Sequence, residues 1–180
     1  LFHSAALSRP MIQHEESPNL SINTNIIGTS NLVMYCNTYG KKIIYVSTDY
    51  VYSGTDNQHT ENSSVRPTNK YSWSKLGGEC AVQLCNKYLI LRLGMVEYPF
   101  PHSHAFTNVY KSSIWSDEVP NTVSLLFEKE GIYNVGGPSE SIYDFVKKRN
   151  PNISKLEAEL DVPKQISMNI EKIKRKDLDI

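Results

Sequence analysis

Two short, uninterrupted apolar runs constrain the fold of this chain more than any other feature. Lys42–Ser47 reads KIIYVS and Tyr88–Leu93 reads YLILRL. Runs of this length are typical of strands buried on both faces, as in a parallel sheet covered by helices. Leu1–Ser4 looks like the end of another buried strand, and amphipathic stretches separate the three. We therefore expect an α/β fold built on a doubly wound parallel sheet.

Helical periodicity and turn residues place the remaining elements. A first helix is expected over about 21–40 and a second over about 71–86. Prolines make the chain after residue 98 less regular, and there we expect a strand over 131–135 and helices over about 141–148, 155–160 and 168–176. The chain thus divides into a regular half, 1–97, and a mixed subdomain, 98–180, with strand 131–135 returning to the main sheet.

Charge and composition exclude several kinds of partner. The 19 Lys and Arg residues balance 19 Asp and Glu residues, so the chain lacks the positive field that a nucleic-acid partner requires. No apolar run reaches the ~18 residues of a membrane helix, and 1–10 does not resemble a signal peptide, so we expect a cytoplasmic protein without a membrane partner. Three cysteines without a Cys-x-x-Cys pair and an isolated His102-Ser103-His104 segment indicate no metal site.

The residues with the most chemical content follow the first clear strand. Thr48 comes at its carboxyl end, where ligands bind in open parallel sheets. Tyr71 and Lys75 are four residues apart at the start of the second helix, so they share one helix face. An ammonium group there is expected to lower the pKa of Tyr71 from about 10 and to favour proton transfer. An exposed helical pair without chemistry is the alternative interpretation of Tyr71 and Lys75.

These three groups suffice for one type of reaction. Thr48 would donate a hydrogen bond to a substrate carbonyl oxygen, and Tyr71 would supply the proton. Lys75 would lower the pKa of Tyr71 and hold the ribose of a nicotinamide cofactor that delivers hydride.

Longer segments carry a family resemblance. HSAALSRP, NTNIIGTSNLV, IIYVSTDYVYSGT, YSWSKLGGE and LILRLG occur in this order between residues 3 and 94. In order and spacing they resemble the extended short-chain dehydrogenase/reductases, and among these most of all the dTDP-4-dehydrorhamnose reductases. The resemblance is close from Leu1 to about Leu93 and weaker from there to the end. It implies a Rossmann-type dinucleotide-binding domain, with catalytic motifs in 1–97 and a substrate-binding subdomain in 98–180.

The resemblance also implies roles for individual residues. Thr48, Tyr71 and Lys75 would be the catalytic triad. The NAD or NADP cofactor would contact Ala5, Ala6, Ser47, Tyr71, Lys75, Leu93 and Gly94, and the substrate would contact Thr48, Asp49, Tyr50 and Met95. Asn25 resembles a position that orients a proton-relay water, and a hydrogen bond at the helix start is its alternative role.

Two departures from the family pattern bear on the expected reaction and on the expected cofactor site. Related 4,6-dehydratases carry Thr-Asp-Glu after the strand, whereas Tyr50 stands here, so elimination of water lacks its carboxylate. None of the nine glycines forms the Gly-x-Gly-x-x-Gly turn that binds the cofactor pyrophosphate, and the residue that selects NAD or NADP is missing with it. Because the resemblance begins at what looks like the fourth strand of the sheet, we expect the first three strands to be absent.

The leading expectation is an NAD(P)H-dependent reductase of a 4-keto-6-deoxy sugar nucleotide, present as a fragment. A sugar-nucleotide 4-epimerase is one alternative. Another is a non-catalytic binding subunit similar to the regulatory subunit of methionine adenosyltransferase. The resemblance further implies a nucleotide-linked sugar as substrate and a possible homodimer through helices 21–39 and 71–86.

Overall fold

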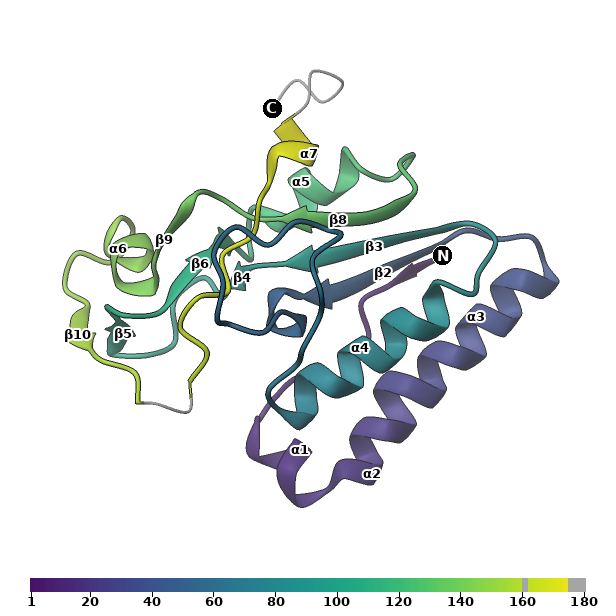
Figure 1. Cartoon of the computed structure of the whole chain (residues 1–180), viewed down its shortest axis with the longest axis horizontal. Helices are drawn as coiled ribbons and strands as arrows, with labels where there is room; N and C mark the ends of the chain where they lie inside the picture. Colours follow the sequence, from purple (N-terminus) through teal and green to yellow (C-terminus); the bar gives the residue numbers. More distant parts are fainter. Residues whose placement is uncertain (160–161, 175–180) are drawn as a thin grey trace.

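The computed structural model describes residues 1–159 and 162–174, and a parallel four-stranded sheet forms its centre (Figure 1). The strands lie in the order β1 (Phe2–His3), β2 (Ile43–Thr48), β3 (Tyr88–Leu93) and β8 (Gly131–Val135). Thr48 lies opposite Leu93, and Leu93 lies opposite Val135. The carboxyl ends of β2, β3 and β8 therefore meet at one edge of the sheet, and the predicted α/β fold with a parallel sheet is confirmed.

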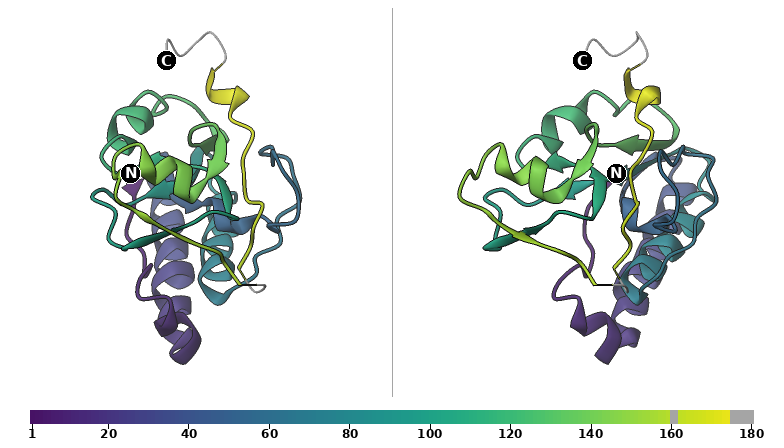
Figure 2. Two further views of the ribbon diagram at one scale, coloured as in Figure 1. Left: turned by 90° about the vertical axis from the view of Figure 1, so that its left-hand side faces the viewer. Right: turned by 60° about the vertical axis from the view of Figure 1, so that its left-hand side comes forward.

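One face of the sheet is covered by α3 (Gly28–Thr38) and α4 (Lys70–Val82), which lie side by side in Figures 1 and 2. The helical region before α3 begins earlier than predicted, with α1 (Ile12–Glu16), α2 (Pro18–Ser21) and a π-helix (Ile22–Ile27). Buried residues of both helices and of the strands form a shared core: Val33, Cys36, Ile43, Tyr45, Val82, Cys85 and Ile90. Asn69 caps α4, because its Oδ1 accepts the Ser72 N–H at 2.9 Å.

The other face packs against α5 (Val119–Ser124) and α7 (Glu171–Lys174). Alternate residues of the strands point to this side, as expected for a period of two. The core here consists of Ile44, Leu89, Leu91, Leu93, Val123, Leu126, Val135 and Ile173. The apolar runs of β2 and β3 thus supply both cores, which explains why they contain almost no polar residue.

Short strands and one helix form a smaller unit beyond the carboxyl edge of the sheet. It contains β4 (Met95–Val96), β5 (His104–Phe106), β6 (Tyr110–Ser112), β7 (Ile114–Trp115), β9 (Ser139–Ser141), α6 (Ile142–Lys147) and β10 (Ser154–Leu156). Strand β4 pairs with β7, β5 with β10, and β6 with β9. The rings of Trp115 and Phe145 stack at 4.6 Å between centroids and form part of its core.

Two helix predictions in this region are wrong. In place of the helix predicted over 155–160, Lys155 and Leu156 belong to β10, which pairs in parallel with β5; residues 157–159 are neither helix nor strand, and residue 160 lies outside the described residues. The Ser154 N–H donates to the Ser103 carbonyl at 3.1 Å, so pairing with a neighbouring strand outweighs the local helical pattern. The helix predicted over 168–176 is only α7, because Met168 pairs with His59 instead; residues 175 and 176 lie outside the described residues.

A buried polar layer fixes α4 on the sheet. The Glu79 carboxylate accepts from the Arg92 guanidinium at 2.8 Å and from the Ser47 hydroxyl at 2.5 Å. Arg92 also donates to the Tyr52 hydroxyl at 2.9 Å. The side chains of Glu79 and Arg92 are 0% and 4% exposed. Buried charges of this kind are tolerated only when paired and hydrogen-bonded, so this layer specifies how α4 sits against β2 and β3.

Two features are absent from the described residues, a membrane-spanning helix and a metal-binding cluster. None of their helices combines the length and apolar character needed to cross a membrane. They also contain no group of three or more His, Cys, Asp or Glu side chains arranged to hold a metal ion.

Candidate active site

Thr48 and Tyr71 come together at the carboxyl end of β2. Thr48 is the last residue of that strand and Tyr71 lies in the first turn of α4. The two side chains are close enough for the Thr48 hydroxyl to lower the pKa of Tyr71, against the larger effect of burial. The Thr48 hydroxyl also donates to Asp49 Oδ1 at 3.2 Å and accepts from the Tyr50 N–H at 3.3 Å. The structure therefore places these two predicted residues in direct contact.

Lys75 lies one turn further along α4 and is 4% exposed. Its ammonium group lies 4.2 Å from the centre of the Tyr45 ring, a cation–π contact. Burial lowers the pKa of Lys75 to about 8, although the Glu79 carboxylate acts in the opposite direction. Burial, and then Lys75 itself, also lowers the pKa of the neighbouring His3.

The prediction that the Tyr71 pKa is lowered is wrong. Burial and then the Asp49 carboxylate raise the pKa of Tyr71 to about 12, against smaller opposing effects of Thr48 and Lys111. Lys75 does not counteract this rise, because its ammonium lies over the Tyr45 ring. Tyr71 is therefore a neutral phenol at pH 7, which is the form that can donate a proton.

Lys111 of β6 is a site residue that the sequence did not reveal. Its ammonium lies 3.0 Å from Asp49 Oδ2, with side-chain exposures of 5% for Lys111 and 1% for Asp49. Burial opposes its charged form, but the Asp49 carboxylate outweighs this and raises the pKa of Lys111. Asp49, predicted to contact substrate, therefore lies in a buried ion pair. The available signal in the sequence was a lysine in a short segment, 109–115 (VYKSSIW), that begins and ends with apolar residues.

Glycines allow β6 to cross close to the ends of β3 and β8. A Cβ atom on Gly94 would lie 2.1 Å from the Ser112 carbonyl oxygen, and one on Gly136 would lie 1.9 Å from the same atom. No side chain fits at such distances, so glycine is required at both positions. This close crossing places Lys111 next to Asp49.

Asn25 lies in the π-helix before α3 and is 1% exposed. Its amide group accepts from the Leu7 N–H at 2.8 Å and donates to the Leu7 carbonyl at 2.9 Å. It also donates to the Ser74 hydroxyl at 2.8 Å. Asn25 thus ties the loop after β1 to α4, close to Tyr71 and Lys75. π-Helical turns are frequent at functional sites, and the proton-relay role of Asn25 stays a prediction.

The residues expected at a cofactor surround the same edge of the sheet. Ala5 and Ala6 follow β1, and Leu93 and Gly94 follow each other at the end of β3. Leu93 lines an apolar cavity of about 380 Å³ together with Ser4, Val46 and Met95. The Ser47 hydroxyl, also expected at the cofactor, instead donates to the buried Glu79 carboxylate.

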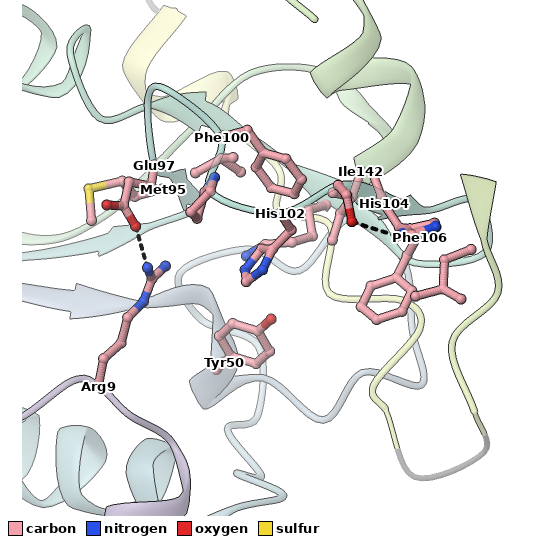
Figure 3. Close-up of a pocket in the computed structure, with 15 residues that line it drawn as sticks. Arg9, Tyr50, Met95, Glu97, Phe100, His102, His104, Phe106 and Ile142 are labelled. Carbon is pink, nitrogen blue, oxygen red and sulfur yellow. Dashed lines mark hydrogen bonds and ion pairs between the residues drawn. The ribbon is translucent and has the colours of Figure 1, made fainter. Parts of the chain in front are cut away.

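A larger cavity of about 700 Å³ opens beside this edge (Figure 3). Two predicted substrate residues, Tyr50 and Met95, line it, and so does Lys111. The other lining residues are Arg9, Val96, Glu97, Phe100, Pro101, His102, Ser103, His104, Ala105, Phe106, Ile142 and Leu156. Arg9 and Glu97 form an ion pair across one side, as the dashed line in Figure 3 shows. From the sequence, His102 and His104 indicated no metal site, and the structure places both in the lining of this cavity.

Comparisons with known proteins agree with this architecture. Over 82 residues, 46% of the chain, it is 40% identical to methionine adenosyltransferase 2 subunit beta from Xenopus laevis. Over 61 residues, 33% of the chain, it is 48% identical to dTDP-D-glucose 4,6-dehydratase from Mus musculus. The matched segments span only 24% and 17% of the lengths of these two proteins.

The fold comparison extends over nearly the whole chain. The structure of dTDP-4-dehydrorhamnose reductase from Bacillus anthracis, solved with NADP, superposes with a TM-score of 0.82. The superposition covers 96% of this chain and 72% of that protein, at 24% sequence identity. The expected Rossmann-type fold is therefore confirmed. Residues 1–110 match the family described as the RmlD substrate binding domain, which is more than half of the 180 residues. The chain belongs to the RmlD substrate binding domain family.

Proposed function

We propose that this chain carries the active site of an NAD(P)H-dependent reductase that acts on a 4-keto-6-deoxy sugar nucleotide. The observation that carries the proposal is the contact between Thr48 and Tyr71, with Lys75 one turn away, beside a cavity of about 700 Å³. In the proposed organisation, residues 1–97 contribute the catalytic motifs and 98–180 the substrate-binding part.

Tyr71 is the proposed acid. A ketone becomes an alcohol when its carbon receives hydride and its oxygen receives a proton. The Tyr71 hydroxyl, neutral with a pKa of about 12, supplies that proton and is left as a phenolate. Thr48 donates a hydrogen bond to the same carbonyl oxygen, for which its hydroxyl must turn from Asp49. For Lys75 to favour the phenolate that forms, its ammonium must turn from the Tyr45 ring towards Tyr71.

The residues at the sheet edge fit the nicotinamide riboside end of a dinucleotide. Ala5 and Ala6 are small and let a ligand approach the backbone, and the Lys75 ammonium donates a hydrogen bond to no oxygen of the described residues. Lys75 is therefore free to hold a ribose hydroxyl. A bound reduced nicotinamide supplies the hydride. NADP and NAD occur in related folds, including the reductase from Bacillus anthracis that was solved with NADP.

The large cavity is the proposed site of the sugar nucleotide. Its volume falls in the usual range for small-molecule sites, and it combines aromatic rings with basic groups. Tyr50, Phe100 and Phe106 offer surfaces for a base or a sugar ring, and Arg9 offers a charge for a diphosphate.

The direct test is turnover of a 4-keto-6-deoxy sugar nucleotide with NADPH or NADH, followed at 340 nm. Tyr71→Phe removes the proton donor, and we expect its rate to fall on the order of a thousandfold. Tyr39→Phe is the matched control, because Tyr39 is 61% exposed and remote from the site. Unchanged turnover in Tyr71→Phe would show that the proposed acid is wrong. A 4-epimerase would convert the sugar without net consumption of the reduced cofactor.

A non-catalytic binding role is the second candidate. The observation in its favour is the 40% identity over 82 residues to methionine adenosyltransferase 2 subunit beta from Xenopus laevis. The presence of Thr48, Tyr71 and Lys75 together favours the enzyme. Co-purification with a methionine adenosyltransferase, with no turnover of any sugar nucleotide, would support the binding role.

A homodimer through α3 and α4 is also proposed. The helical layer that begins before α3 exposes apolar side chains, among them Ile27, Met34, Tyr35, Trp73 and Leu84. Exposed apolar patches of this kind mark interaction surfaces. Light scattering of the purified chain tests this: Tyr35→Lys together with Met34→Lys should convert a dimer into a monomer. A parent chain that is monomeric at all concentrations would refute the dimer.

A further inference from the structure

The Lys111–Asp49 ion pair lies between the large cavity and the catalytic residues, and the reaction proposed above gives Asp49 no role. The two charged groups are 3.0 Å apart and almost fully buried. Taking two charges out of water is costly, so a buried pair beside the catalytic residues calls for an explanation.

Lys111 contacts two consecutive residues of the turn after β2, Asp49 and Tyr50. Asp49 Oδ2 faces its ammonium, while Asp49 Oδ1 accepts from the Thr48 hydroxyl at 3.2 Å. The same ammonium lies 4.6 Å from the centre of the Tyr50 ring. The backbone N–H of Tyr50 donates to Thr48 Oγ1. The Asp49 carboxylate thus links Lys111 to Thr48, and the Thr48 hydroxyl acts on the neighbouring Tyr71.

The backbone around Lys111 is anchored on both sides. Next to it, the Ser112 hydroxyl donates to the Met168 carbonyl at 2.8 Å and accepts from the Met168 N–H at 3.0 Å. On the other side, the Tyr110 N–H donates to the Lys164 backbone carbonyl at 2.8 Å, and the Tyr110 carbonyl accepts from the Ile166 backbone N–H at 3.1 Å. The ammonium is therefore held at a fixed place and is not a mobile surface charge.

We propose that Lys111 is a positioning residue of the proposed active site: through Asp49 it holds the Thr48 side chain beside Tyr71 before substrate binds, and it cancels the Asp49 charge there. The inference rests on the proposed function. The charged and titratable groups around Tyr71 come from five elements: Tyr45 of β2, Asp49 and Tyr50 of the turn after β2, Lys111 of β6, His14 of α1, and Lys75 of α4 itself. Among them Asp49 disfavours a phenolate and Lys111 favours it.

Ionisation of Tyr71 provides a test that needs no turnover. It is followed by NMR of ring-labelled tyrosine in the whole chain, with the signal assigned from Tyr71→Phe. Asp49→Asn removes the opposing charge and should lower the pKa of Tyr71 by about one unit. Lys111→Met should leave Tyr71 un-ionised up to pH 12. Lys148→Met, which removes an exposed ion pair with Glu140, is the matched control and should leave the titration unchanged.

Measurements of unfolding separate the effect of Lys111 on stability from its effect on the active site. Lys111→Met should increase the unfolding equilibrium constant on the order of a hundredfold at pH 8, because it leaves Asp49 buried and unpaired. This loss should shrink towards pH 5 as Asp49 becomes protonated, and the double variant Asp49→Asn with Lys111→Met should recover most of it. In turnover, Lys111→Met should lower kcat at least tenfold and leave KM nearly unchanged.

The outcomes can be told apart. If stability changes as described while Tyr71 titrates identically in the parent, Asp49→Asn and Lys111→Met, the pair is structural only and the inference is wrong. A parent chain without reductase activity would contradict the proposed function instead, and the Tyr71 titration would still decide the role of Lys111.

Discussion

Gly94→Ala is the most specific test of how the site is assembled. A Cβ atom at this position would lie 2.1 Å from the Ser112 carbonyl oxygen and 3.0 Å from its carbonyl carbon, whereas ordinary contacts begin near 3.4 Å. The neighbouring atoms belong to backbone, so no side chain can rotate away. β6 has to move by about 1 Å, and overpacking of this kind costs about 1–3 kcal/mol.

The free energy of unfolding is measured in urea, with the buried Trp115 as a fluorescent probe. We expect Gly94→Ala to lose about 2–3 kcal/mol, since hydrogen bonds of β6 are strained in addition. Gly28→Ala is the matched control, because a Cβ there meets only the Asn23 carbonyl oxygen at 3.4 Å. In a helix that change should be neutral or stabilise by up to about 1 kcal/mol. Equal urea midpoints for the parent and Gly94→Ala would refute the close crossing of β6.

Two further predictions concern buried charges. Arg92→Met leaves the Glu79 carboxylate buried without its cation and should cost about 3–5 kcal/mol, against less than about 1 kcal/mol for Lys148→Met, both from urea unfolding. Lys75 has a folded pKa of about 8 against 10.5 ordinarily, so the unfolded chain binds its proton more tightly. The cost of burying the charged form is therefore complete below pH 8 and is relieved between pH 8 and 10.5. The parent should gain at most about 3 kcal/mol over that range relative to Lys75→Met, and parallel pH curves for the two would contradict the lowered pKa.

Burial explains which elements the sequence could predict. β2 and β3 lie within one residue of the predicted strands, because both faces of each strand are buried and the apolar runs are continuous. β10 was predicted as a helix, because its three residues are exposed and its pairing with β5 depends on a partner about 50 residues away. Local patterns report burial well and distant pairing poorly.

In the candidate active site, too, some features could be predicted from the sequence and others could not. The contact of Thr48 with Tyr71 follows from a general property of parallel sheets, in which strand ends and the following helices meet at one edge. The position of Lys111 depends on β6 crossing two glycines, which no local pattern encodes. The pKa of Tyr71 was predicted in the wrong direction, because helical spacing brings Lys75 near but does not reveal the burial of Tyr71 or the ring of Tyr45 under the ammonium.

Transfer of deuterium from a reduced cofactor tests the central claim most directly. The chain is incubated with a 4-keto-6-deoxy sugar nucleotide and nicotinamide cofactor deuterated at the transferred position, and the product is analysed by mass spectrometry and NMR. The account predicts one deuterium at C4 of the sugar with the parent and with Tyr39→Phe, and almost none with Tyr71→Phe. Product without deuterium at C4, or full labelling with Tyr71→Phe, would contradict it.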